Sequence, residues 1–312
     1  MMTLTADNLL YLSRCAITAA RQAGELISGY VDRDVDVQVK EGGGDNLASQ
    51  VVTEVDLRSE AVIVEALQPT CEEYDLGLLT EERGDDGSRL QKDYFWCVDP
   101  IDGTLPFIEG VPGYAVSIGL VSQAGEALIG VVYDPLSKTL YSAIKGQGAL
   151  RNGEAWALPS NTSLTGKPLT LVCDRSLQEL PVYPRLLEQF ETIAKRMGAA
   201  GLRRLHKGGA VMNGCWVLEN PPACYYKIPK PQQGGGSLWD FAAIACLFHE
   251  MGAMATDFHG QPLDLNRADS TFMNHRGVIF TTDQALLSEI IKGIGPDKLL
   301  LDSGQGHAGM TA

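Results

Sequence analysis

The N-terminal part of the chain carries two stretches with helical periodicity, separated by a polar, glycine-rich segment. Apolar side chains recur at helical spacing over residues 8–30, which predicts a long amphipathic helix with Asp7 as its N-cap. The same periodicity predicts a second helix over residues 53–67. Between the two, residues 37–40 are typical of a short strand and residues 41–46 of a flexible loop.

Short apolar runs dominate the middle of the chain. Residues 76–79 and 94–98 are continuous apolar runs, typical of strands that are buried on both faces. Further strands and one hairpin are predicted at 114–121, 127–133, 139–144 and 151–154. These segments together predict a meander of strands that follows the buried run at 94–98.

The second half of the chain alternates between segments typical of strands and segments with helical periodicity. A segment rich in Ser, Thr, Asn, Gly and Pro at 159–168 reads as a linker. Beyond it, strands are predicted at 169–173, 223–228 and 278–281, and helices at 183–197, 208–217, 238–251 and 283–294. We therefore predict an α+β half over 1–160, an α/β half over 161–301 and a flexible tail over 302–312.

Composition narrows the class of protein. The 312 residues allow about two domains of ~150 residues each. The formal net charge is −14, from 25 basic and 39 acidic residues. Such a charge argues against a nucleic-acid polymer or an anionic membrane as the main partner. A small anionic substrate stays possible, because a bound metal ion inverts the local field.

The cysteines and the lengths of the apolar runs indicate in which cellular compartment the protein works. The 7 cysteines are odd in number and form no C-x-x-C pair, which predicts reduced thiols in a cytoplasmic protein. The first residues lack the basic and apolar segments of a signal peptide. No apolar run reaches the ~20 residues that a membrane helix needs, so we expect no membrane partner.

Two acidic residues follow the buried run at 94–98. Asp99 and Asp102 are separated by Pro100 and Ile101, and Gly103 permits a tight turn directly after them. Ligands of open α/β sheets bind at the carboxyl ends of strands, and paired carboxylates there favour Mg²⁺ or Ca²⁺. The alternative is a solvated acidic turn, since Asp, Pro and Gly are common turn residues.

Two further acidic motifs, one before and one after the pair of aspartates in the chain, complete a recognisable set. Glu81 follows the apolar run at 76–79, the segment Asp-Pro-Ile-Asp-Gly-Thr spans 99–104, and Trp239-Asp240 opens a predicted helix. In this order the motifs resemble the inositol monophosphatase family over most of the chain. The resemblance implies an α/β fold, a layered α-β-α-β-α sandwich of the sugar phosphatase type, and a homodimer. It also implies a Mg²⁺-dependent phosphomonoesterase.

The resemblance assigns metal ligands residue by residue. Glu81, Asp99 and the Ile101 carbonyl would hold the first Mg²⁺ ion. Asp99, Asp102 and Asp240 would hold the second, and a third, looser ion would also use Glu81. The gathered acids tolerate one another only with cations between them, which predicts weak folding of this site without metal.

The resemblance also implies catalytic roles. The main chain of Asp102, Gly103 and Thr104 would position the phosphate. A metal-activated water would attack phosphorus, with Glu81 accepting its proton and Thr104 orienting it. Asp240 would help to protonate the leaving oxygen through water.

One position departs from the family pattern. Thr53 and Asp56 match an early family motif, but Gln50 stands where family members carry an aspartate that pairs with the threonine matched by Thr104. Gln50 accepts a hydrogen bond without carrying charge, and Asp45 could substitute for it. A non-catalytic metal- or phosphate-binding regulatory protein on the same fold is therefore a second class of function to test.

The resemblance implies a small phosphorylated metabolite as the substrate, with several candidates. Inositol-specific members place a glutamate in the segment before Trp239, whereas this chain has Lys227 and Lys230 there. These lysines would suit a second anionic group on the substrate, or they are solvated charges of a surface loop. We rank an inositol phosphatase-like activity first and a 3′(2′),5′-bisphosphate nucleotidase second, with histidinol phosphate as a third candidate substrate.

Overall fold

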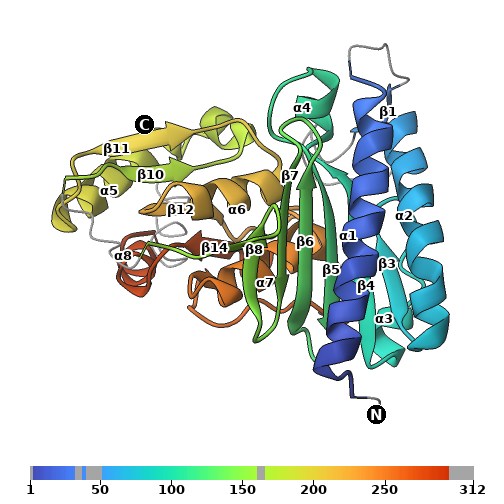
Figure 1. The fold of residues 1–312 in the computed structure, drawn as a ribbon. Coiled ribbons are helices and arrows are strands. Elements are labelled where there is room, and N and C mark those ends of the chain that lie inside the picture. Colours follow the sequence, from blue (N-terminus) through green and yellow to red (C-terminus); the bar gives the residue numbers. More distant parts are fainter. Residues whose placement is uncertain (1–2, 32–36, 40–50, 160–165, 295–312) are drawn as a thin grey trace, which may run out of the picture.

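The computed structural model describes residues 3–31, 37–39, 51–159 and 166–294. Helices α1 (Ala6–Ser28) and α2 (Glu54–Glu73) form an outer layer over one face of a large sheet (Figure 1). The strands of this sheet are, in spatial order, β3 (Gly77–Thr80), β4 (Tyr94–Asp102), β5 (Ala115–Ser122), β6 (Ala127–Asp134), β7 (Thr139–Ile144), β8 (Gly148–Arg151) and β9 (Glu154–Trp156).

Helices α6 (Ala210–Glu219) and α7 (Leu238–Glu250) lie between this sheet and a smaller one (Figure 1). The smaller sheet has the order β11 (Leu202–Leu205), β10 (Leu169–Val172), β12 (Ala223–Lys227), β14 (Val278–Thr281) and β13 (Met254–Thr256). Helices α5 (Tyr183–Arg196) and α8 (Gln284–Ile294) cover its outer face. This order of layers confirms the predicted α-β-α-β-α sandwich.

Short elements complete the fold. The helices α3 (Ser88–Gln91) and α4 (Thr104–Ile108) flank β4 in the chain, and a 3₁₀ helix, η2 (Arg175–Glu179), follows β10. Strands β1 (Val37–Val39) and β2 (Val51–Thr53) pair with each other in antiparallel fashion. The predicted loop at 41–46 and the tail at 302–312 lie outside the described residues.

Strand β4 is buried on both faces, as its continuous apolar run predicts. Trp96 and Val98 pack toward α1 and α2, whereas Phe95 and Cys97 pack toward α7. Because side chains alternate along a strand, Asp99 falls on the face of Phe95 and Cys97. The first acidic residue of the motif thus points to the side of the sheet on which α7 lies.

Helix α7 approaches the large sheet closely because glycines and alanines meet at the contact. A Cβ atom at Gly119 would lie 2.8 Å from the Cβ atom of Ala242, and one at Gly130 would lie 2.1 Å from the carbonyl oxygen of Ala243. The hydroxyl of Ser117 on β5 donates to the carbonyl oxygen of Trp239 at 3.1 Å. These contacts fix the first turn of α7 against the sheet.

The boundaries of two helices differ from the prediction. The N-cap of α1 is Thr5, whose hydroxyl accepts a hydrogen bond from the backbone N–H of Asn8, so the prediction of Asp7 was wrong. Asp7 lies in the first turn, where a negative charge interacts favourably with the helix dipole. Helix α2 passes through Pro69 to Glu73 instead of ending at 67, and its Thr70 hydroxyl accepts from the Trp96 indole.

The described residues agree with a reduced protein that has no membrane helix. All seven cysteines are free thiols, as predicted. No helix in the described part of the chain is both long and apolar enough to cross a membrane. The largest buried cluster contains Phe95 from the first predicted half and Phe241 from the second, and the division at residue 160 stays a prediction.

Candidate metal centre

The two aspartates of β4 are fixed by the irregular end of that strand. The register of β4 on β5 shifts between Asp99 and Asp102, which turns the second side chain relative to the first. The Asp99 carboxylate accepts a hydrogen bond from the backbone N–H of Ile101 at 3.0 Å. The Pro100 carbonyl accepts from the Ser59 hydroxyl at 3.0 Å, which ties the turn to α2.

Asp102 lies against the start of α6. Its two carboxylate oxygens accept hydrogen bonds from the backbone N–H groups of Ala210 and Val211, each at 2.9 Å. A Cβ atom on Gly209 would lie 2.3 Å from the same carboxylate, so only glycine fits there. The small-residue start of α6 therefore brings backbone donors, and with them the second half of the chain, against β4.

Asp240 arrives from the first turn of α7. Its carboxylate accepts from the backbone N–H of Ser237, and the Ser237 side chain in turn accepts from the backbone of Asp240. This reciprocal capping box fixes the Asp240 side chain at the end of the helix that faces β4. The role of Asp240 as a metal ligand stays a prediction.

The three aspartates form one cluster. Ligand atoms of Asp99, Asp102 and Asp240 all lie within 4.8 Å of one another. Burial, followed by the charges of Glu81, Asp102 and Asp240, holds the pKa of Asp99 well above its usual range. Burial and the charge of Asp240 do the same to the pKa of Asp102. Two buried carboxylates and a partly buried third, held this close together, are a donor set that fits a divalent, oxygen-preferring cation.

Glu81 and Ile101 border this cluster. Glu81 directly follows β3, and its backbone N–H continues the ladder by donating to the Val98 carbonyl oxygen at 3.1 Å. Glu60 supports the next residues by accepting from the backbone N–H of Glu82 at 2.9 Å. The Glu81 carboxylate contributes to the raised pKa of Asp240, which places its charge near the cluster.

Thr104 has a buried partner that the sequence analysis did not assign. Its hydroxyl donates to the Asp56 carboxylate at 3.2 Å, and the Ile101 carbonyl is a second acceptor at 3.4 Å. The other carboxylate oxygen of Asp56 accepts from the hydroxyl of Thr53 at 2.6 Å. The Thr-x-x-Asp capping pattern at 53–56 was the available signal, since it directs Asp56 back toward the helix start. Gln50 and Asp45 lie outside the described residues.

Gly103 makes the turn from β4 into α4 possible. Its φ is +86°, a conformation that glycine adopts without steric cost. A Cβ atom there would lie 2.5 Å from the Gly113 carbonyl oxygen. Helix α4 begins at Thr104, directly after this turn.

Lys227 lies beside the acidic cluster and pairs with Asp174. Its ammonium nitrogen is 3.2 Å from the Asp174 carboxylate, whose other oxygen accepts from the Tyr225 hydroxyl at 2.9 Å and from the Asn213 amide at 3.1 Å. Sequence reasoning named Lys227 but did not identify Asp174 as its partner. The Lys230 backbone N–H donates to the Asn274 carbonyl oxygen, and the Lys230 carbonyl oxygen accepts from the Asn274 side-chain amide. A substrate contact by either lysine stays a prediction.

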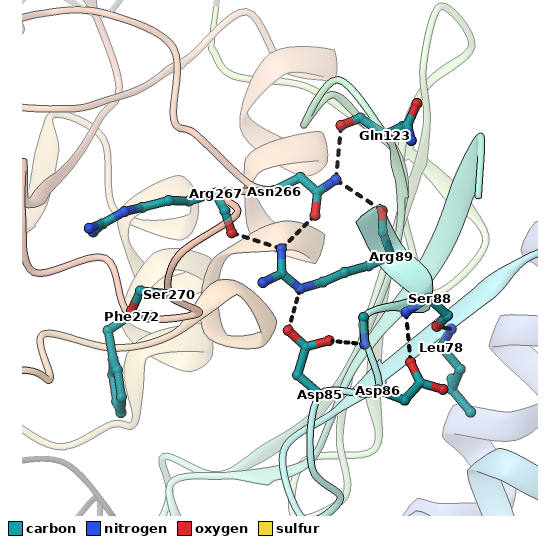
Figure 2. Close-up of polar contacts among 11 residues, drawn as sticks. Leu78, Asp85, Asp86, Ser88, Arg89, Gln123, Asn266, Arg267, Ser270 and Phe272 are labelled. Atoms are coloured by element: carbon teal, nitrogen blue, oxygen red, sulfur yellow. Dashed lines mark hydrogen bonds and ion pairs between the residues drawn. The ribbon is translucent and has the colours of Figure 1, made fainter. Parts of the chain in front are cut away.

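A buried arginine joins the strand layer to the C-terminal half (Figure 2). The Arg89 guanidinium donates to Asp85 at 2.7 Å, and to the Asn266 side chain and the Arg267 carbonyl at 2.8 Å each. Asn266 returns hydrogen bonds to the carbonyl oxygens of Arg89 and Gln123. We call these residues the Arg89 clamp. The segment beyond it pairs with the start of α7, since the Leu238 N–H donates to the Thr271 carbonyl oxygen.

Comparisons with known proteins agree with this architecture. A sequence profile of the inositol monophosphatase family matches residues 8–293. Nus factor SuhB of Pseudomonas aeruginosa is 34% identical to this chain over 249 residues, covering 78% of the chain and 84% of that protein. Nus factor SuhB of Escherichia coli is 31% identical over 255 residues, with 78% and 84% covered.

Solved structures show the same fold. An inositol monophosphatase from Anabaena covers 93% of this chain and 99% of its own, with 24% identity and a TM-score of 0.66. Inositol monophosphatase II from Staphylococcus aureus covers 93% of this chain and 97% of its own, with 21% identity and a TM-score of 0.69. At these identities, the likeness speaks for the fold alone.

The relatives overturn one prediction. The net charge of −14 led us to exclude a nucleic-acid polymer as a partner, but relatives that match most of this chain are named Nus factors. The exclusion was wrong because net charge averages over the whole surface and does not report on local patches or on contacts made through another protein. The homodimer and the cytoplasmic location stay predictions.

Proposed function

The chain belongs to the inositol monophosphatase family, and from this premise we propose that it is a Mg²⁺-dependent phosphomonoesterase acting on a small phosphorylated metabolite. The observation that carries the proposal is the convergence of Asp99, Asp102 and Asp240 within 4.8 Å. These carboxylates come from two segments far apart in sequence, and Asp99 and Asp102 are buried despite the repulsion between the acids. Such an arrangement is costly for folding unless cations occupy it.

We assign the ligands of two to three Mg²⁺ ions from this geometry and from the family. Asp99, Asp102 and Asp240 would form the centre of the set, with Glu81 and the Ile101 carbonyl at its border. When bound, the ions would neutralise charge on the phosphate and activate a water for attack. The protein supplies the fixed positions of these ligands, and it does so through β4 and the capping box of α7.

Residues around the cluster would handle the proton and the phosphate. Glu81 would accept the proton of the attacking water. The Thr104 hydroxyl donates to Asp56, which leaves its oxygen lone pairs available to accept from a water on the other side. The backbone of Asp102, Gly103 and Thr104 would position the phosphate.

The substrate class follows from the neighbourhood of the cluster. We rank an inositol phosphatase-like activity first, as a general phosphomonoesterase of this family. A 3′(2′),5′-bisphosphate nucleotidase comes second, because Lys227 and Lys230 would suit a second anionic group. Hydrolysis rates on inositol 1-phosphate, adenosine 3′,5′-bisphosphate and histidinol phosphate would rank the three candidates.

The relatives support a second function of another class. Proteins that match most of this chain are named Nus factors, so a non-catalytic role on the same fold is the competing proposal. The two proposals differ in whether the acidic cluster turns over a phosphoester. A protein that binds Mg²⁺ but hydrolyses none of the three substrates would favour the non-catalytic role.

The test compares phosphate release by the wild type and Asp99→Asn, with and without Mg²⁺. We expect turnover only with Mg²⁺, and a loss of more than ~100-fold in Asp99→Asn, because one shared ligand is removed. Asp269→Asn is the matched control, since Asp269 is exposed and pairs with Arg267 outside the acidic cluster. Equal rates in wild type and Asp99→Asn would refute the proposed site.

A further inference from the structure

The residues around Lys227 build a fixed positive charge next to the acidic cluster. Lys227 ends β12, and its ammonium nitrogen lies 5.8 Å from the ring centre of Phe241, the residue that follows Asp240 on α7. The side chain is only 17% exposed, so little water competes for its charge. The ammonium group therefore lies between the start of α7 and the start of η2.

Asp174 holds that charge in place. One of its carboxylate oxygens accepts from both Tyr225 and Asn213, and the other lies 3.2 Å from the Lys227 ammonium nitrogen. Two neutral donors thus fix the carboxylate, and the carboxylate fixes the lysine. Lys227 is thereby pre-positioned and is not a mobile surface side chain.

The cluster and the lysine interact electrostatically in both directions. Burial alone would lower the pKa of Lys227, but the charges of Asp174, Asp240 and Asp102 outweigh it and raise that pKa. Conversely, the positive charge of Lys227 opposes the burial that raises the pKa of Asp102 and Asp240. The ammonium group therefore lies close enough to act on the same carboxylates that a divalent cation would use.

We propose that Lys227, positioned by Asp174, is an internal cation that weakens divalent-ion binding on the Asp102–Asp240 side of the cluster. The ammonium group supplies positive charge to these carboxylates permanently, so an arriving ion gains less by neutralising them. The inference deepens the proposed function but concerns the loading of the site and not the chemistry on a phosphoester. Its sign can be tested because Lys227 and Asp174 carry opposite charges.

The experiment is calorimetric titration of the metal-stripped protein with Mg²⁺ alone. We expect Lys227→Met to lower the Kd for Mg²⁺ by roughly three- to tenfold, because a neighbouring positive charge is removed. Asp174→Asn should raise the Kd by a similar factor, because the lysine then acts on the cluster without its counter-charge. Lys227→Arg keeps the charge and should stay near the wild type. If the substitutions merely loosened the fold, both Lys227→Met and Asp174→Asn would weaken Mg²⁺ binding. Changes of opposite sign in the two Kd values therefore exclude that explanation.

Lys145→Met is the matched control. Lys145 directly follows β7, its side chain is 50% exposed, and it pairs with the Glu126 carboxylate. We expect its Kd for Mg²⁺ to equal that of the wild type. An unchanged or weakened Mg²⁺ affinity in Lys227→Met would overturn the inference. Such a result, with a loss of activity confined to adenosine 3′,5′-bisphosphate, would make Lys227 a substrate contact.

The inference and the proposed function can fail separately. If Mg²⁺ affinities shift with opposite signs but no phosphomonoester is hydrolysed, Lys227 tunes the metal centre of a non-catalytic protein. If hydrolysis depends on Asp99 but the Mg²⁺ affinities do not shift, the proposed phosphatase activity is supported and the proposed role of Lys227 is wrong.

Discussion

At the scale of single residues, the aspartates of the acidic cluster are less favourable as anions in the folded protein than in water. Burial raises the pKa of Asp99, Asp102 and Asp240, and a neighbouring acid adds to the rise: other aspartates for Asp99 and Asp102, and Glu81 for Asp99 and Asp240. Their ionised forms are therefore less stable in the folded protein than in the unfolded chain. This difference links the stability of the metal-free protein to pH.

We predict that the metal-free protein loses stability as the pH rises. The unfolded chain releases the aspartate protons near its ordinary pKa of 3.8, whereas the folded protein keeps them to higher pH. The free energy of unfolding should therefore be highest below that value and fall as the pH rises through the raised values. Urea unfolding in EDTA, from about pH 5 to about pH 8, measures this slope.

Two comparisons identify the cause of that slope. Mg²⁺ should remove most of it, because bound cations stabilise the ionised carboxylates. Asp99→Asn should also flatten it in EDTA, since one of the three titrating groups is gone. A slope of the opposite sign in the wild type would mean that these carboxylates are stable as anions without metal.

From the sequence we identified three acids that the structure brings into one cluster, but not the partners that hold them in place. Asp99, Asp102 and Asp240 were identified from short motifs, because the order of those motifs along the chain is specific. The contacts from Asp56 to Thr104 and from Asp174 to Lys227 join segments far apart in sequence. Such pairs depend on how distant elements pack, and no local pattern reveals them.

At the scale of elements, continuous apolar runs predicted the buried strands well. Strands at the edge of a sheet with polar side chains were missed. Strand β11 contains Arg203 and Arg204 and lies at the edge of its sheet, so its pattern resembles surface charge. Helix α3 spans too few residues to show a period. The capping of α1 by Thr5 was missed because Asp7 is also a good N-cap residue.

The contact between α7 and the large sheet leads to a prediction about Gly130. Its Cβ atom would lie 2.1 Å from the carbonyl oxygen of Ala243, which is a backbone atom and cannot move alone. Gly130→Ala should therefore destabilise the protein by at least about 1–3 kcal/mol, measured by urea unfolding. It should also weaken Mg²⁺ binding, because Asp240 lies on the helix that is displaced.

Gly84→Ala is the control for this substitution. Gly84 lies in the loop after β3, and an added Cβ atom would meet no other atom within 4 Å. We expect its unfolding free energy to stay within about 0.5 kcal/mol of the wild type. If Gly130→Ala behaves like Gly84→Ala, α7 does not depend on the close approach to β6.

At the scale of the whole molecule, the Arg89 clamp connects the large sheet with the segment that leads to α7 (Figure 2). The Asn266 side chain makes three hydrogen bonds of the clamp. Without this side chain, the buried Arg89 guanidinium and the carbonyl oxygens of Arg89 and Gln123 would each lose a partner. We predict that Asn266→Ala destabilises the protein by about 1–3 kcal/mol in urea unfolding.

The clamp prediction has a control in the same segment. Asp269 is 69% exposed and pairs with Arg267, which contributes only its carbonyl oxygen to the clamp. Asp269→Ala should therefore change the free energy of unfolding by less than about 0.5 kcal/mol. Equal destabilisation by both substitutions would mean that the segment as a whole, and not the clamp, sets the stability.

The metal centre also constrains when the protein can become competent during its synthesis. Asp99 and Asp102 leave the ribosome with the first sheet, but Asp240 and the backbone donors of Ala210 and Val211 follow much later. A nascent chain that ends in the linker region contains the repelling pair of β4 without the groups that complete its surroundings. We therefore predict that cation capture is a late event of biogenesis, so that prematurely terminated chains neither retain magnesium nor act on phosphoesters.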